Sequence, residues 1–452
     1  MPQTPSTQQD NQQSRLFYGW VMLPITTIGL ICSAPGQSFG VQPFKELFSE
    51  SLGLARWEVS TAYMVGTALA ALPMTYIGTC MDRFGARRTL MVIVTLMALA
   101  CLLMSQAQGV FTLFLAFLML RTFGQGSLTL LNFNTMAMWF HRRLGLVNAL
   151  MSIGLAGAIA TVPAFNNTLI NQFGWRWAYA LLGLGAWALM FPLLVFAFRN
   201  KPEDVGQRTD NDPHPHPDAP PPEPERAFSL RDAMRTRAYW IMLLMIGFWA
   251  LANTGLVFCM GSVFRTRGLE LTAANAQAAQ VMFAFGLTLA AMQLPAGVLV
   301  DRAPAHRVLV IAGLGMVGVF SLFRFSGGSG AMVYVIGVCQ GIAQSLLMAV
   351  NAVMWVRYFG RANLGRIRGT VTSTMVGASA AGPLMLDLTH ELVGRYEPMI
   401  TVFALVPLGL AVAAMFATPP RDTETPLAPD VEEPLEEPET AVSETTVTEP
   451  GG

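Results

Sequence analysis

The sequence predicts an all-α membrane protein whose twelve membrane-spanning helices form two pseudo-symmetric bundles of six. Apolar residues make up 53% of the 452 residues and charged residues only 12%, about half the share of about 25% found in soluble domains. Charge-free stretches long enough for a helix to cross the bilayer hydrocarbon, about 20 residues, recur along the chain. They lack the alternation of barrel strands, and other backbone conformations are too costly in lipid. One short motif occurs twice, 219 positions apart, which indicates the duplication.

Each span is expected where an apolar run is bounded by charged or turn-forming residues. Two charge-free runs, 89–120 and 144–175, are too long for one crossing, and the first is divided at the polar stretch 106–109. The expected spans are 18–42, 58–79, 88–106, 110–138, 145–168, 175–198, 239–263, 273–299, 307–325, 331–356, 366–389 and 397–417.

Five segments follow from these spans. The segment between the sixth and seventh spans is rich in proline and charge, as flexible linkers are. Its His214-Pro215-His216 sequence could bind a metal, but a solvated loop is favoured. The C-terminal segment has ten acidic residues and one arginine, a composition typical of disorder. The expected segments are a cytoplasmic tail 1–17, a first bundle 18–198, a cytoplasmic linker 199–238, a second bundle 239–417 and an acidic tail 418–452.

The distribution of positive charge predicts the orientation in the membrane. Of 28 lysines and arginines, 20 fall in the tails and loops on the same side as the two chain ends. The positive-inside rule therefore places both ends in the cytoplasm, in a cytoplasmic (inner) membrane. The first 14 residues lack the basic start and apolar core of a cleaved signal, so the first span is expected to remain. The net charge of zero suggests no nucleic-acid partner.

The repeated motif, Gly-x-x-x-Asp-Arg, is expected to act as a conformational switch at two equivalent helix ends. Asp82 can accept hydrogen bonds from a neighbouring helix N-terminus or an arginine, and so join two helices in one conformation and release them in the other. Gly78 is expected to permit close approach and Gly85 a tight turn. The alternative is that the arginines serve as topology signals. The predicted switch residues are Gly78, Asp82, Arg83, Gly85, Arg87 and Arg88 in the first copy and Gly297, Asp301 and Arg302 in the second.

Two polar stripes are the strongest candidates for substrate contacts. Arg121, Gln125 and Asn132 fall within about 40° of one another on a regular α-helix. Polar groups in lipid normally face a cavity or another helix. Two interpretations of the stripe are therefore open: it lines the substrate path, or it only forms hydrogen bonds between helices. The same spacing recurs 219 positions later, at Gln340, Gln344 and Asn351.

Three further polar residues lie where glycine and proline loosen the first and seventh spans. Gln37 and Ser38 follow Pro35-Gly36, and Asn253 precedes Gly255. Loosened helices can turn backbone carbonyls toward a cavity, so these side chains are candidate substrate contacts, with packing as the alternative. No acid lies near the middle of an expected span. Asp387 is expected near an outer end, which leaves uniport, exchange and proton symport open.

On these residues the chain resembles the major facilitator superfamily over nearly all of 15–418. The stretch from Gly78 to Arg88 is similar to the family's signature loop between helices 2 and 3. Further stretches resemble the monocarboxylate and oxalate/formate transporter branch. They are Tyr18-Gly19-Trp20, Ser38-Phe39-Gly40-Val41, Phe44-Lys45-Glu46-Leu47, Trp57-Glu58-Val59-Ser60, Trp139-Phe140-His141-Arg142-Arg143-Leu144-Gly145-Leu146 and Phe173-Gly174-Trp175-Arg176-Trp177-Ala178.

The resemblance implies alternating access by rocking of the two halves, with helices 1, 4, 7 and 10 lining the cavity. Cations that relatives carry in helices 1, 8 and 11 are absent here, where the chain has Gln37-Ser38 and the cation-free stretches 273–300 and 369–386. Arg121 is therefore expected to be the only buried cation available to a carboxylate, which favours a monoanion over a dianion.

The sequence thus predicts a secondary active transporter of a small organic anion, most consistent with a monocarboxylate. The alternative is an efflux carrier for drugs or neutral solutes, and a remote alternative is a non-transporting membrane sensor. No clustered nucleophile, base or metal set indicates an enzyme. The five cysteines suit neither a metal site nor a disulfide framework, so no cofactor is expected. The expected partners are the substrate, the bilayer and a coupling proton or counter-substrate, and the expected state is a monomer.

Overall fold

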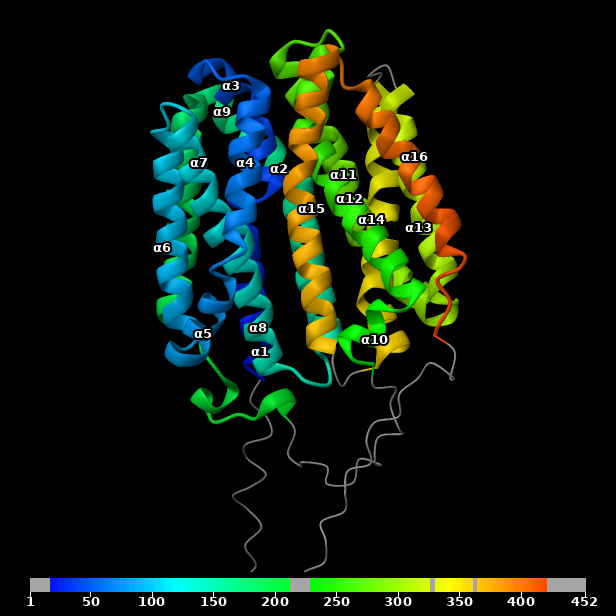
Figure 1. Cartoon of the computed structure of the whole chain (residues 1–452). Helices are drawn as coiled ribbons and strands as arrows, with labels where there is room; N and C mark the ends of the chain where they lie inside the picture. The colour runs from blue at the N-terminus through cyan, green and yellow to red at the C-terminus, as the bar shows by residue number, and fades with distance from the viewer. Residues whose placement is uncertain (1–16, 212–227, 326–329, 361–363, 421–452) are drawn as a thin grey trace, which may run out of the picture.

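The computed structural model describes residues 17–211, 228–325, 330–360 and 364–420, and these residues form helices and connecting turns without strands. Figure 1 shows two groups of helices side by side, one from each half of the chain. The segment that follows the first group, the start of α1 and the end of α16 all lie at one end of the molecule (Figure 1). We call this end the linker side and the opposite end the far side.

The first expected span is a broken helix. α1 (Gly19–Cys32) ends before a 3₁₀ turn at Ala34–Gly36, and the short helix α2 (Ser38–Val41) follows. A second 3₁₀ turn, Gln42–Phe44, leads into α3 (Lys45–Leu52) on the far side. Pro35 and Pro43 each sit in a turn, where a residue without a backbone N–H is tolerated. The breaks leave backbone carbonyls such as that of Gly36 available to side chains.

The remaining helices of the first half follow the expected spans with two departures. The second span is divided into α4 and α5, and the fourth contains a π-helical stretch. The last two spans join in one 53-residue run, which reverses at Gly174, where φ is +75°; a straight helix of that length would measure about 80 Å. The elements are α4 (Arg56–Ala70), α5 (Met74–Phe84), α6 (Ala86–Ser105), α7 (Val110–Met119), η4 (Leu120–Leu128), α8 (Thr129–Trp139) and α9 (Leu144–Phe196).

The second half begins with the short helix α10, which precedes six long helices. In the described part of the chain, nine helices are long and apolar enough to cross a membrane. The His-Pro sequence at 214–217 and the acidic tail from 421 onward lie outside the described residues. The elements are η5 (Pro202–Val205) and η6 (Thr209–Asn211) after the first half, then α10 (Leu230–Met234), α11 (Arg237–Thr266), α12 (Leu271–Arg302), α13 (Ala305–Phe325), α14 (Gly330–Phe359), α15 (Leu364–Val393) and α16 (Glu397–Ala414).

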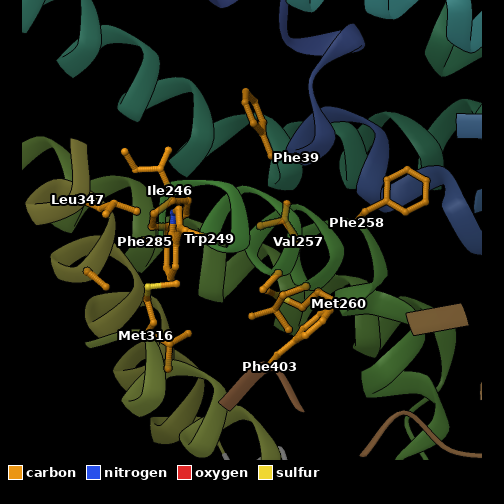
Figure 2. Close-up of a cluster of buried hydrophobic side chains, with 14 of the residues drawn as sticks. Phe39, Ile246, Trp249, Val257, Phe258, Met260, Phe285, Met316, Leu347 and Phe403 are labelled. Carbon is orange, nitrogen blue, oxygen red and sulfur yellow. The ribbon is translucent and has the colours of Figure 1, made fainter. Parts of the chain in front are cut away.

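The buried apolar side chains form two clusters that differ between the two ends of the molecule. One cluster is continuous across the two halves and includes residues of the far-side parts of the first half, such as Phe48 and Tyr63. Figure 2 shows part of it in the second half, where Trp249 lies beside Ile246 and Phe285. The other cluster is confined to the linker-side part of the first half. The halves are therefore packed together on the far side.

Candidate functional site

A cavity of about 760 Å³ lies between the two halves. One wall comes from α4 and α5, from Thr67 to Met74. A second comes from η4 and α8, and the third from the linker-side part of α15, between Gly369 and Gly377. Of the sixteen lining residues, seven are apolar (alanine, leucine, methionine, phenylalanine and valine), three are glycine and six are polar. The polar residues in it are Thr67, Arg121, Gln125, Thr129, Thr372 and Ser373. An apolar chamber of this size with a few polar groups is typical of a small-molecule site.

Arg121 supplies the positive charge of the cavity wall. Arg121 is only 3% exposed. Its Nη1 donates to the backbone carbonyl of Gly36 at 3.0 Å. The guanidinium carbon lies 4.9 Å from the ring centroid of Tyr63, in range for a cation–π interaction. Among the described residues no carboxylate pairs with Arg121, and Nε lacks a hydrogen-bond partner. A buried cation without a counter-charge is costly, so the site favours an anion.

The π-helical stretch changes which side chains share the face of Arg121. Gln125 lines the cavity with Arg121, as expected. Asn132 does not: its Nδ2 donates to the Leu128 carbonyl at 2.7 Å, and the side chain packs against Gly29 of α1. Because π-helical bonding places about 4.4 residues in a turn instead of 3.6, seven such residues turn Asn132 roughly 100° away from Arg121. Thr129 and Phe133 take its place in the lining.

The equivalent stripe in the second half is engaged within that half. Gln340 donates to Oδ1 of Asn253 at 2.6 Å, and Gln344 accepts from the indole N–H of Trp249. Asn351 accepts from Trp355 at 2.8 Å. None of the three stripe residues, nor Asn253, is in the lining of the cavity. In this conformation they act as interhelical and intrahelical hydrogen-bond partners, the alternative the sequence had left open.

Gln37 and Ser38 connect the broken first span to the cavity region. Gln37 Nε2 lies 3.1 Å from Ser33 Oγ and 3.5 Å from Thr129 Oγ1, a cavity-lining group. Ser38 Oγ lies 2.7 Å from the hydroxyl of Tyr63. Both residues therefore position groups next to Arg121 and Thr129 and stand behind the wall itself.

A buried ion pair joins the two halves on the far side of the cavity. Lys45 Nζ in α3 lies 2.7 Å from Asp387 Oδ2 in α15, and the two side chains are 2% and 0% exposed. Asp387 also accepts from Ser60 at 2.5 Å and from the Tyr396 hydroxyl at 2.9 Å. Lys45 is thus a second buried cation, but it is paired with Asp387 and does not line the cavity, so the expectation that Arg121 is the only buried cation available to a carboxylate stays a prediction. Asp387 is fully buried because the first half of the molecule covers this end of α15.

Glu46, next to Lys45, is the centre of a second set of contacts between the halves. Arg56 of the first half donates to it through Nε at 3.0 Å and Nη2 at 2.8 Å. From α11, Ser262 donates at 2.5 Å and Arg265 at 3.0 Å. Burial acts to raise the pKa of the Glu46 carboxyl, but the bonds and charge of Arg56 and the charge of Lys45 outweigh it and lower the pKa to about 2. We call these contacts and the Lys45–Asp387 pair the far-side gate.

Sequence reasoning missed the far-side gate. Lys45 and Glu46 appeared only as part of a family-like stretch, and Asp387 as an acid at a span end. The one available signal was two charges placed directly after the Pro43 break, inside a segment otherwise apolar up to that point. The partner of Lys45, Asp387, is 342 positions away, so only the packed structure identifies the pair.

The two copies of the repeated motif differ in their contacts. Gly85 adopts φ +85° and forms the expected tight turn, and Arg87 caps the end of α9 through the Leu194 carbonyl at 2.8 Å. The expectation that Gly78 permits close approach is wrong in this conformation, because a Cβ there would meet open space; the same is true of Gly297.

The aspartates of the two copies also differ. Asp82 is exposed, whereas Asp301 pairs with Arg357 of α14 at 2.8 Å. Arg83, Arg88 and Arg302 are exposed as well. In the second copy the motif therefore joins two helices of one half, and in the first its arginine fixes the end of the bundle.

Membrane-length helices in two similar halves, with a cavity between the halves, are the architecture found in membrane transporters. The family model described as "Major Facilitator Superfamily" matches residues 20–275 and 261–447. The chain belongs to the major facilitator superfamily.

Individual relatives share less of the chain. A "Multidrug resistance protein B homolog" occurs in two strains of Mycobacterium tuberculosis, CDC 1551 / Oshkosh and ATCC 25618 / H37Rv. Each is 33% identical over 157 residues, 34% of this chain and 28% of the relative. The chain thus matches little more than a quarter of the length of these curated relatives.

Two solved structures of a bacterial homologue of the human lysosomal transporter Spinster show the same fold. The inward-facing, unoccupied form has a TM-score of 0.63 and 14% identity over 88% of this chain and 95% of that one. The inward-facing, occupied form has a TM-score of 0.60 and 13% identity over 89% and 92%.

Proposed function

We propose that the chain is a secondary active transporter of a small organic anion, a monocarboxylate, working by alternating access. The observation on which this rests is Arg121, a buried guanidinium at the cavity wall with no carboxylate partner among the described residues. A single carboxylate would supply the missing counter-charge and accept from the Nε that is now unpaired. One cation balances one negative charge, which favours a monoanion.

The conformation supports the proposed mechanism. The gate seals the far side, while the cavity reaches the linker-side parts of α8 and α15. We assign the linker side to the cytoplasm, which the excess of arginine in its loops supports, and so the conformation to an inward-facing state. In the opposite state the gate residues separate and Arg121 becomes accessible from the far side. The same polar and apolar lining residues then contact the substrate in both states.

The test is uptake of labelled lactate into proteoliposomes. Arg121→Ala removes the counter-charge and reduces uptake at least a hundredfold, whereas Arg121→Lys keeps the charge and retains part of the activity. Arg208→Ala removes an exposed arginine of the linker side and leaves uptake unchanged. Wild-type uptake by Arg121→Ala, with lactate transported by the parent protein, excludes Arg121 from the substrate site.

A second candidate is efflux of a drug or neutral solute. The lining favours it at Ala68, Ala71, Leu130, Phe133 and Val376, where apolar side chains offer surface to an uncharged molecule. The similarity to a multidrug resistance protein homologue supports it over about a third of the chain. A lipophilic substrate would be transported equally well by Arg121→Ala and by the parent protein, and lactate would not compete with it.

A further inference from the structure

A continuous set of ring and charge contacts connects Arg121 to the far-side gate. The guanidinium of Arg121 lies over the ring of Tyr63 at 4.9 Å. That ring packs against the ring of Phe258, with centroids 4.3 Å apart. Lys45 Nζ lies 5.3 Å from the centroid of the Phe258 ring, and Lys45 pairs with Asp387. Each contact is short enough to interact directly.

The Tyr63–Phe258 contact crosses the boundary between the two halves. Tyr63 belongs to α4 and Phe258 to α11, and both residues are fully buried. In Figure 2 Phe258 lies beside the blue ribbon of the first half, apart from the group around Trp249 and Ile246. Because the two halves must separate here for the far side to open, the pair lies in the part of the interface that moves.

The position of the Tyr63 ring is set from the cavity side. Its hydroxyl lies 2.7 Å from Ser38 Oγ, in the broken first span, and the Phe117 ring meets it edge-on at 5.4 Å. The Arg121 guanidinium carbon also lies 4.9 Å from the centroid of this ring. A cation that bonds to a substrate anion moves its charge off the ring, and the ring then loses one of the contacts that fix it against Phe258.

We propose that Tyr63 is a positioning residue that couples the occupancy of Arg121 to the far-side gate. An anion at Arg121 weakens the cation–π contact, which loosens the Tyr63–Phe258 contact and lowers the cost of opening the gate. The anion in this statement rests on the proposed function, whereas the coupling between Arg121 and the gate through Tyr63 does not.

The native Cys259 reports on the gate without a new side chain. It is fully buried, 3.0 Å from Lys45 Nζ, and becomes reachable when the gate separates. The experiment measures its labelling by a membrane-impermeant maleimide applied from the far side. In the protein used, Cys32, Cys80, Cys101 and Cys339 are replaced by alanine, so that Cys259 alone reacts.

The decisive comparison is a double-mutant cycle that needs no substrate. Arg121→Gln raises the labelling rate about thirtyfold, the equivalent of about 2 kcal/mol for a desolvated cation–π contact, and Tyr63→Leu also raises it. In the double variant Arg121→Gln adds nothing to Tyr63→Leu, because its route to the gate is gone. Tyr63→Phe keeps the ring and preserves the effect of Arg121→Gln. Multiplicative effects in the double variant, or no effect of Arg121→Gln alone, overturn the coupling.

Two controls separate coupling from general loosening and from the substrate assignment. Phe403→Leu removes a buried ring that packs on Phe248 and Phe320 inside the second half, and it leaves labelling unchanged. An equal increase in Phe403→Leu would assign the effect to lost packing and overturn the proposal. Lactate accelerates labelling of the parent protein; if the cycle holds but lactate has no effect, the monocarboxylate assignment fails and the coupling stands.

A second, independent observation concerns the linker side of the second half. A hollow of about 400 Å³ is lined by Leu230, Met234 and Trp240 together with three exposed arginines, Arg231, Arg235 and Arg366. Its shape is fixed, because the Trp240 indole donates to the Met234 carbonyl at 2.7 Å. The hollow combines apolar side chains with guanidinium groups and lies next to a tryptophan at a helix end. This combination fits the region of a membrane where headgroups meet acyl chains.

We infer that this hollow binds the phosphate headgroup of an anionic phospholipid. Among the described residues, the ion pair that these arginines form is between Arg235 and Asp232, at 3.9 Å, and one carboxylate beside three guanidiniums leaves a net positive charge. The three guanidiniums therefore remain available to a phosphate, while Met234 and Trp240, 40% and 44% exposed, offer surface to the glycerol and upper acyl chain.

The test is thermal unfolding of the full chain in phosphatidylcholine nanodiscs with and without phosphatidylglycerol. Phosphatidylglycerol raises the midpoint of the wild type by several degrees, and the triple change of Arg231, Arg235 and Arg366 to glutamine removes most of that increase. The matched control changes three exposed arginines on the linker side of the first half, Arg83, Arg88 and Arg143, to glutamine and keeps the increase. Equal losses in the two triple variants, or an increase reproduced by inorganic phosphate in plain nanodiscs, overturns a lipid site here.

Discussion

Breaking the Lys45–Asp387 pair should shift the protein toward the far-side-open state. Asp387→Asn keeps a side chain that accepts from Ser60 and Tyr396 but leaves the Lys45 ammonium buried without a counter-charge. Removing one partner of a buried ion pair costs about 3–5 kcal/mol, and opening the gate returns Lys45 to water. At 1.36 kcal/mol for each tenfold step, the ratio of open to closed forms rises by about two to three and a half orders of magnitude.

The assay is the distance between spin labels on the far side, at Ser51 of α3 and Leu392 of α15, in a background without native cysteines. Both positions are exposed and belong to different halves, so the distance increases when the gate opens. Asp387→Asn moves the distribution to longer distances. The exchanged pair Lys45→Asp with Asp387→Lys restores much of the short-distance population.

The matched control is Asp301→Asn, which breaks the pair with Arg357 on the linker side. That pair is 68% and 40% exposed, so its loss is worth at most about 1 kcal/mol and leaves the far-side distance unchanged. An unaltered distribution in Asp387→Asn, or an equal shift in both variants, refutes the reasoning that the buried pair closes the gate.

Two further predictions concern Glu46 and the repeated motif. Because the folded-state pKa of Glu46 is lowered to about 2, its stabilising contribution is complete above about pH 4.3 and is lost as pH falls toward 2. The difference in thermal midpoint between wild type and Glu46→Gln is therefore constant from about pH 8 to 5, and a difference that changes in that range contradicts the assignment. Gly85→Ala lowers stability by about 1–2 kcal/mol, because φ is +85° and a Cβ would lie 3.1 Å from Asn200. Gly78→Ala, where a Cβ meets open space, is neutral; equal losses in denaturation midpoint would show that the turn is not strained.

The fold was predictable because the lipid environment imposes it locally. Apolar length and the absence of charge define each span wherever water is excluded, and the break in the first span follows from Pro35, Gly36 and Pro43. Gly174 likewise marks the reversal between the fifth and sixth spans. These signals are confined to short stretches of sequence, and the structure has helices at every expected span.

The site was less predictable because it depends on helix register and on contacts between halves. Arg121 and Gln125 line the cavity, but the π-helical stretch that turns Asn132 away has no clear mark in the sequence. The pairing of Lys45 with Asp387 depends on how two bundles pack, which no local pattern encodes. The internal repeat suggested equivalent roles for Gln340 and Arg121, because the two residues match in position. In the structure Gln340 bonds to Asn253 behind the cavity wall.

The central claim is that one cavity is reached from one side at a time. Ser373 of α15 lines the cavity, and a cysteine there, in a background without native cysteines, reports its accessibility to impermeant thiol reagents in oriented vesicles. Labelling is expected from the linker side alone in the parent protein, and labelling from the far side is expected to increase strongly in Asp387→Asn. Labelling from both sides at equal rates in the parent protein, or from neither side in both proteins, would contradict it.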